Sequence, residues 1–153
     1  MLCYIASDHG GFALKEALKE SLAKKFEVKD LGCDSEESCD YPDFAVLAAK
    51  AVAKEKGSLG ILCCGTGIGM SLAANKVKGI RAAVVYDEFT AKMAREHNNA
   101  NIACFGGRNI KPETAAQLAG LFLTAKFAGE TKEGARHLKR VLKIGEIEKR
   151  YFK

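Results

Sequence analysis

Apolar and polar positions along this chain form blocks that predict strands and helices in turn. Short apolar runs, typical of buried strands, occur at residues 2–7, 26–31, 59–64, 80–85 and 102–105. Amphipathic or alanine-rich stretches predict helices at residues 12–24, 42–54, 70–76, 88–97, 112–125 and 132–147. The second of these helices is expected to begin at Pro42, because proline is favoured at the first helical position.

Strands that alternate with helices predict an α/β fold whose parallel sheet is covered on both faces. We expect residues 1–153 to form one domain, a Rossmann-like or flavodoxin-like three-layer sandwich with a five-stranded parallel sheet and an added C-terminal helix. With right-handed crossovers, the commonest order of five strands is 2-1-3-4-5. This order places the loops after strands 1 and 3 at one crevice, at the carboxyl edge of the sheet.

The composition is that of an ordinary globular domain, with 48% hydrophobic and 28% charged residues. No apolar run approaches the roughly 20 residues that span a membrane, and the N-terminus does not resemble a signal peptide. We therefore expect a cytoplasmic protein with no membrane partner. The net charge of +5 is concentrated in residues 132–153, but this segment lacks interleaved aromatic residues for stacking on bases. No nucleic-acid partner is expected.

The chain has six cysteines, and their spacing predicts neither disulfides nor a metal site. Cys3, Cys63 and Cys104 lie inside apolar runs and are expected to be small core residues. There is no C-x-x-C pair and no Cys/His spacing typical of zinc. We therefore expect no bound metal.

The residues with the clearest chemistry follow the third strand, where Cys64 precedes three alternating glycines, Gly65, Gly67 and Gly69. Glycines allow successive backbone N–H groups to point into one concavity, and a helix N-terminus beyond them favours a negative charge. The same field is expected to favour the thiolate of Cys64 over its thiol. An acid–base thiol beside an anion hole predicts an enzyme.

Other phosphate-binding loops are possible interpretations of this turn. It is not a Walker A loop, because no Gly-Lys-Ser/Thr closes it, and it is not a cysteine phosphatase loop, because Met70 stands where those loops have arginine. A dinucleotide site remains an alternative, with Asp87 as the ribose-binding acid. The G-x-G-x-G spacing and the thiol at the entrance of the turn both speak against it.

Two histidines and two arginines are further candidates. His9 follows the first strand beside Asp8, and His97 lies just before the fifth strand, where we expect it at the same edge of the sheet. Arg136 and Arg140 share one helical face and could hold a phosphate dianion through forked hydrogen bonds. Taken alone, the arginines fit an exposed, solvated helix better than a phosphate site.

Seven segments, spread in order over almost the whole chain, resemble those of type B ribose-5-phosphate isomerases. They are Ser-Asp-His-Gly-Gly-Phe (7–12), Asp-Tyr-Pro-Asp (40–43), Cys-Gly-Thr-Gly-Ile-Gly-Met-Ser-Leu-Ala-Ala-Asn-Lys (64–76), Gly-Ile-Arg-Ala (79–82), Glu-His-Asn-Asn-Ala-Asn (96–101), Phe-Gly-Gly-Arg (105–108) and Arg-His-Leu-Lys-Arg (136–140). The resemblance implies an aldose–ketose isomerase that interconverts ribose 5-phosphate and ribulose 5-phosphate through a cis-enediolate, without a cofactor.

The resemblance also implies roles for individual residues. Cys64 corresponds to the base, and His97, assisted by Thr66, to the group that opens the furanose ring. Some relatives instead use a glutamate just after the glycines, where this chain has Met70. The implied substrate-binding residues are Asp8, His9, Tyr41, Gly65, Gly67, Ile68, Gly69, Ser71, Asn98, Arg108, Arg136 and Arg140. Among these, the amides of residues 65–69 would stabilise the enediolate.

Members of this family are homodimers or dimers of dimers with shared active sites. The resemblance therefore implies that His97, Asn98, Arg136 and Arg140 reach Cys64 from a second copy of the chain, and that His9 and the two arginines grip the phosphate. Three alternatives remain: a hexose 6-phosphate such as allose 6-phosphate or galactose 6-phosphate as substrate, a non-catalytic phosphosugar sensor, and a nucleotide-binding protein.

Overall fold

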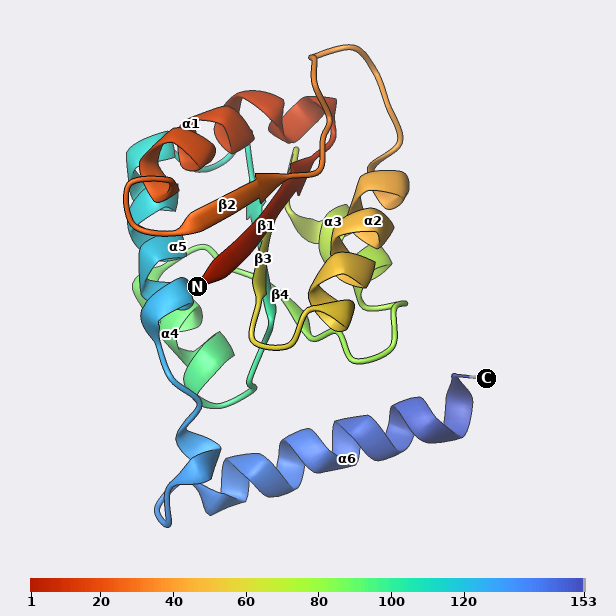
Figure 1. Cartoon of the computed structure of the whole chain (residues 1–153), viewed down its shortest axis with the longest axis vertical. Coiled ribbons are helices and arrows are strands. Elements are labelled where there is room, and N and C mark those ends of the chain that lie inside the picture. Colours follow the sequence, from red (N-terminus) through yellow and green to blue (C-terminus); the bar gives the residue numbers. More distant parts are fainter. Residues whose placement is uncertain (153) are drawn as a thin grey trace.

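The computed structural model describes residues 1–152, and its core is a five-stranded parallel sheet (Figure 1). The strands are β1 (Leu2–Ser7), β2 (Glu27–Asp30), β3 (Leu59–Cys64), β4 (Ala82–Val84) and β5 (Ile102–Gly106). Each pair of neighbouring strands is parallel, so all carboxyl ends meet at one edge. This confirms the predicted fold class.

Helices cover both faces of the sheet and are α1 (Phe12–Leu22), α2 (Tyr41–Lys54), α3 (Ile68–Ala74), α4 (Glu88–Glu96) and α5 (Pro112–Thr124). Helices α1, α4 and α5 lie on one side, and α2 and α3 on the other (Figure 1). Along β3, Ile61 and Cys63 enter the first of these two cores, whereas Leu62 and Cys64 enter the second. The alternation of a strand thus separates the two adjacent cysteines.

The predicted strand order 2-1-3-4-5 is wrong, because the observed order is β2-β1-β3-β5-β4. Every residue of β5 is buried, whereas all three residues of β4 are only partly buried, so β5 suits a central position and β4 an edge. The loop after β5 consequently lies beside the loop after β3. Strands β1 and β3 are neighbours as expected, so the loops that follow them start side by side at the carboxyl edge.

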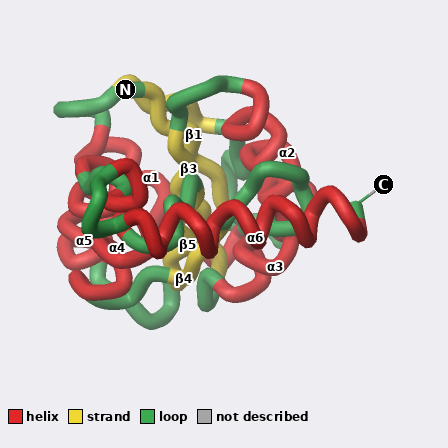
Figure 2. The backbone as a smooth tube through the Cα atoms, turned by 90° about the horizontal axis from the view of Figure 1, so that it is seen from below, coloured by secondary structure: helices red, strands yellow, loops and turns green. Residues whose placement is uncertain are grey.

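The last helix, α6 (Ala135–Tyr151), stands apart from the three layers. It follows the short helix η2 (Ala128–Glu130), begins later than predicted and runs four residues further, to Tyr151. It crosses below the end of the sheet where the strands begin (Figures 1 and 2). Several apolar side chains along it, including Leu138, Leu142 and Ile147, are exposed. Within residues 1–152, no helix has the length and apolar character needed to cross a membrane.

Candidate active site

Strand β3 brings Cys64 to the carboxyl edge of the sheet, where the chain turns into α3. The amide of Gly67 donates a hydrogen bond to Cys64 Sγ, with 3.0 Å between nitrogen and sulfur. Gly67 has a φ of +79°, and a Cβ placed on it would lie 3.0 Å from the backbone carbon of Phe105. Both the left-handed conformation and this close approach therefore require glycine. The turn holds the sulfur with little freedom.

The loop after β1 places Asp8 and His9 at the same edge. Asp8 is almost fully buried, and its Oδ1 accepts a hydrogen bond of 3.0 Å from the amide of Gly11. His9 Nδ1 lies 3.2 Å from both the amide nitrogen and the carbonyl oxygen of Cys39. The histidine ring is thus held through Nδ1 by the loop between β2 and α2, which leaves Nε2 for a ligand.

Arg108, in the loop after β5, joins this cluster because of the observed strand order. The amide of Gly107 donates to the Cys64 carbonyl at 2.7 Å, and the amide of Arg108 donates to the Gly65 carbonyl at 3.1 Å. A Cβ on Gly65 would lie 3.1 Å from Arg108 Nη1, and one on Gly10 would lie 3.4 Å from Nη2. The guanidinium therefore lies against the loops that follow β1 and β3.

The remaining predicted residues of this edge are close by but differ in exposure. The Tyr41 ring packs against Gly69, where a Cβ would come within 3.0 Å of the ring. Thr66 is exposed, and its Oγ1 accepts a hydrogen bond of 3.3 Å from the Ile68 amide. Ser71 donates its hydroxyl to the Ile68 carbonyl at 2.8 Å, within its own helix. We call the set Asp8, His9, Tyr41, Cys64, Thr66 and Arg108, with the 65–69 turn, the carboxyl-edge cluster.

His97 does not lie at this edge, and the prediction that it does is wrong for a single chain. It caps the C-terminus of α4, just before β5 begins, and the start of a parallel strand lies at the opposite, amino edge. Asn98 is next to it, and Arg136 and Arg140 are on α6, below the same edge (Figure 1). We call His97, Asn98, Arg136, His137 and Arg140 the α6 cluster.

The α6 cluster is held together by two stacked histidines. The rings of His97 and His137 lie 4.0 Å apart between centroids at an angle of 10°. Burial lowers the pKa of His137, and the neighbouring His97, Arg136 and Arg140 lower it further. Arg136 and Arg140 line a shallow hollow of about 320 Å³ together with Lys139 and Lys143. This helical face is therefore strongly basic.

Asp87, the acid of the alternative nucleotide site, has a different task. Its carboxylate accepts the amide of Thr90 at 2.7 Å and so caps the N-terminus of α4 in a capping box. These hydrogen bonds lower the pKa of Asp87. It also follows the edge strand β4, with β5 between it and the glycine turn. The structure therefore does not support Asp87 as a ribose-binding acid for the turn.

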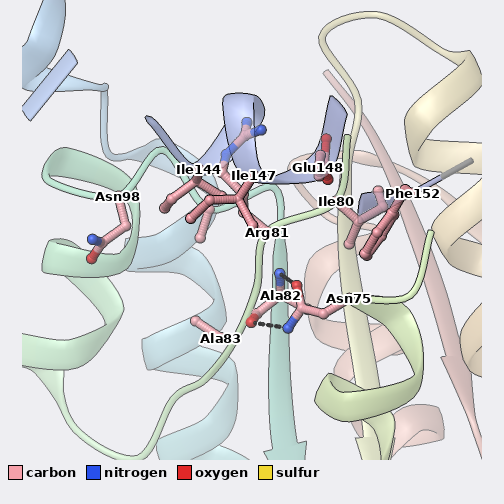
Figure 3. Close-up of a pocket in the computed structure, with 11 residues that line it drawn as sticks. Asn75, Ile80, Arg81, Ala82, Ala83, Asn98, Ile144, Ile147, Glu148 and Phe152 are labelled. Carbon is pink, nitrogen blue, oxygen red and sulfur yellow. Dashed lines mark hydrogen bonds between the residues drawn. The ribbon is translucent and has the colours of Figure 1, made fainter. Parts of the chain in front are cut away.

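Sequence reasoning missed several polar residues that shape the surroundings. Lys15, in α1, was not singled out from the sequence but is fully buried, with Nζ 2.6 Å from Asp30 Oδ2. Arg81 and Arg95 bond the turn that carries His97, and the paired asparagines before β5 are the only signal of that turn in the sequence. A cavity of about 420 Å³ lies between α6 and residues 75–83 (Figure 3). Within residues 1–152, no three His, Cys, Asp or Glu side chains gather as a metal site would need.

Comparison with known proteins assigns the chain to a family. The sequence model of the Ribose/Galactose Isomerase family matches residues 3–144. A putative sugar phosphate isomerase of Bacillus subtilis is 46% identical, covering 95% of this chain and 96% of that protein. Ribose-5-phosphate isomerase B of Escherichia coli is 42% identical, covering 94% of this chain and 93% of its own.

Solved structures agree with this assignment. A ribose-5-phosphate isomerase B from Clostridium thermocellum superposes with a TM-score of 0.93 at 47% identity, covering 99% of both chains. The enzyme from Mycoplasma genitalium, solved with bound ribulose-5-phosphate, gives 0.89 at 45% identity, covering 97% of this chain and 96% of its own. The chain belongs to the ribose/galactose isomerase family. The prediction of an aldose–ketose isomerase of sugar phosphates is confirmed at this level.

Proposed function

We propose that this protein interconverts ribose 5-phosphate and ribulose 5-phosphate. The observation that carries the proposal is the thiol of Cys64, held at the entrance of the glycine turn with the Gly67 amide 3.0 Å from its sulfur. The three relatives named ribose-5-phosphate isomerase B above are each more than 40% identical to this chain, and one was solved with ribulose-5-phosphate. That kinship and the geometry support the proposed substrate and mechanism.

In the proposed reaction, Cys64 acts as the base of the isomerisation. It takes the proton from C2 of the open-chain aldose, and the C1 carbonyl becomes an enediolate oxygen. The proton then returns to C1 while the O2 hydroxyl passes its proton to O1, so that O2 becomes the ketone oxygen and O1 a hydroxyl. Amides of residues 65–69 face the developing negative charge, and one such donor is typically worth about 3 kcal/mol of barrier.

Ring opening and phosphate binding need the α6 cluster, which lies at the other edge of the same chain. We propose that a second copy supplies it, so that His97, Asn98, Arg136 and Arg140 of one chain complete the carboxyl-edge cluster of the other. The exposed apolar side chains of Leu142 and Ile147 support this, because α6 has little contact with its own sheet. The substrate phosphate would then lie between His9 and the two arginines.

Turnover of ribose 5-phosphate in excess EDTA tests the function, with Cys64→Ala as the decisive variant. General base catalysis is worth about 10²–10⁴-fold, so the variant should lose at least about 100-fold in kcat and keep its affinity for inorganic phosphate. Cys3→Ala is the matched control, because Cys3 is buried at the far end of β1 and should retain activity. Full activity of Cys64→Ala would contradict the assigned base.

The same assay decides between pentose and hexose substrates. Allose 6-phosphate run in parallel should turn over more slowly than ribose 5-phosphate. If only allose 6-phosphate is turned over, the proposed mechanism stands and the proposed substrate is wrong. An unaltered protein that binds phosphate but isomerises neither sugar would overturn the enzyme proposal in favour of a phosphosugar sensor.

A further inference from the structure

The turn that carries His97 and Asn98 has an unusual backbone. It joins α4 to β5, and Asn99 within it has a φ of +47°, the one positive φ of a non-glycine residue in residues 1–152. Asparagine tolerates this left-handed region better than most residues, yet the conformation persists only where neighbours hold it. His97 directly follows the last residue of α4, so its position depends on the contacts that fix this turn.

Arg95, in the last turn of α4, holds the turn from the helix side. Its Nη1 donates to Asn99 Oδ1 at 2.9 Å and to the Ala100 carbonyl at 2.8 Å. Its guanidinium carbon lies 5.9 Å from the centroid of the Phe122 ring, within the range of a cation–π contact. One side chain thus bonds two successive residues of the turn.

Arg81, just before β4, holds the turn from the sheet side. Its Nε donates to the Asn99 carbonyl at 2.8 Å, and its amide donates to Asn101 Oδ1 at 2.8 Å. The Asn101 amide group in turn donates to the Gly79 carbonyl at 2.9 Å. Figure 3 shows the Arg81 side chain extending from the start of the strand toward α6. Both arginines therefore converge on Asn99.

Neither arginine forms an ion pair in the described part of the chain that would explain its place, although the charge of Glu148 raises the pKa of Arg81 against the effect of burial. Within residues 1–152, no carboxylate forms an ion pair with Arg81 or Arg95. Burial lowers the pKa of both guanidiniums, and Arg81 lowers that of Arg95 further. Two half-buried cations side by side are unfavourable unless their hydrogen bonds offset the cost. Here those bonds go to the oxygens of the turn.

We propose that Arg81 and Arg95 are positioning residues for ring opening, because together they fix the turn that orients His97. This inference rests on the proposed function. Ring opening breaks the bond between C1 and the ring oxygen: the ring oxygen gains a proton, and the C1 hydroxyl loses one to become the carbonyl. A shift of the turn would move His97 away from the ring oxygen, while the chemistry at Cys64 would be unaffected.

Solvent exchange separates positioning from general stability. Ribulose 5-phosphate cannot close a furanose ring, because its C5 hydroxyl carries the phosphate, so exchange of its C1 proton with solvent deuterium needs the enediolate but no ring opening or closure. Arg95→Lys and Arg81→Lys keep the charge but lose the guanidinium geometry. We expect each to lower kcat/KM for the isomerisation of ribose 5-phosphate about 10- to 100-fold, and the rate of this exchange much less. His97→Ala should show the same asymmetry, and the exposed Arg150→Lys should show no change.

Two results would overturn the proposal: unchanged kinetics in both arginine variants, or equal losses of isomerisation and of C1-proton exchange that follow lost thermal stability. A second measurement does not depend on the reaction. The chain has three histidines, and in the NMR spectrum of Arg95→Lys the ring signals of stacked His97 and His137 should shift while that of His9 stays in place. If the unaltered protein isomerises neither sugar, the proposed function fails, and this spectrum alone decides whether the arginines set the turn.

Discussion

The carboxyl-edge cluster and the α6 cluster are built in different ways. The first consists of short loops that leave buried strands, and backbone hydrogen bonds such as those from Gly67 and Gly107 fix its atoms. The second joins His97 and Asn98, which follow α4, to α6, an exposed helix whose main contacts are with η2 and whose link to the body includes one pair of stacked rings. The comparison suggests that the carboxyl edge provides preformed catalytic geometry, whereas α6 provides positive charge that another copy of the chain can use.

The largest effect expected from disturbing the rigid cluster is that of Gly67→Ala. The new Cβ would meet backbone at 3.0 Å and the residue would keep a strained positive φ, so the turn and its amides would move. We expect kcat to fall about 100-fold, as for the loss of an oxyanion donor.

Gly57→Ala is the matched control for that variant. Gly57 also has a positive φ, of +87°, but a Cβ there meets nothing within 4 Å. Its substitution should cost about 1 kcal/mol of stability and leave kcat unchanged. Equal kcat values for the two variants would show that the 65–69 turn is not the rigid element described here.

A smaller effect is expected from the buried lysine that supports the same edge. Lys15 is fully buried and bonds Asp30, whereas Lys19 bonds the same carboxylate at 2.8 Å from a half-exposed position. Lys15→Met should lower the free energy of unfolding by about 3 kcal/mol, and Lys19→Met by less than about 1 kcal/mol. Urea denaturation measures both, and equal losses would contradict the assigned role of burial.

The pH dependence of unfolding follows from the same contact. Burial by itself raises the pKa of Asp30, but hydrogen bonds from Lys15, Lys19 and the Gly32 amide hold it below its usual value. A carboxylate with a lowered folded-state pKa contributes stability above its unfolded pKa, and this contribution is lost as the pH falls through the folded one. The loss of stability below about pH 4 should therefore be shallower in Lys15→Met than in the unaltered protein.

The smallest effect concerns the α6 cluster, where His137 reports on bound anions. Its pKa is lowered by burial and by neighbouring positive charge, so the neutral ring is favoured in the folded state and stability falls as the pH drops below the unfolded value. Inorganic phosphate on Arg136 and Arg140 should raise the pKa of His137 in an NMR titration. Arg140→Ala should abolish this rise, and an unchanged pKa in the unaltered protein would contradict the assigned anion site.

Much of the fold was predictable because local patterns determine it. The boundaries of β1 and β3 match those expected, since continuous apolar runs with polar or glycine-rich ends define buried strands. The order of β4 and β5 was not predictable from the commonest topology, although the more apolar sequence of β5 already favoured a central position. Which strands pair depends on the relative stability of alternative pairings over the whole chain, and no local sequence pattern determines it.

The candidate site was predictable to the same limited degree. The Cys64 turn, Asp8 and His9 follow strands, and such residues meet at one edge by geometry alone. His97 was misplaced because it precedes a strand. The burial of Lys15 was not foreseen, because a charged residue in an amphipathic helix is expected to be exposed. The roles of Arg81 and Arg95 become visible only from the backbone conformation of Asn99. In the sequence, Arg81 stands just before β4 and Arg95 near the end of α4, and the two share no motif.

The most direct test of the account mixes two inactive variants. Cys64→Ala and Arg140→Ala are each purified, confirmed to have lost most of their turnover of ribose 5-phosphate, then mixed in equal amounts under mild denaturant and refolded together. If two copies share each site, half of the dimers are mixed and each has one intact site, so activity should return to about one quarter of normal. A mixture that stays as inactive as its parents would contradict the claim that α6 of one copy completes the active site of the other.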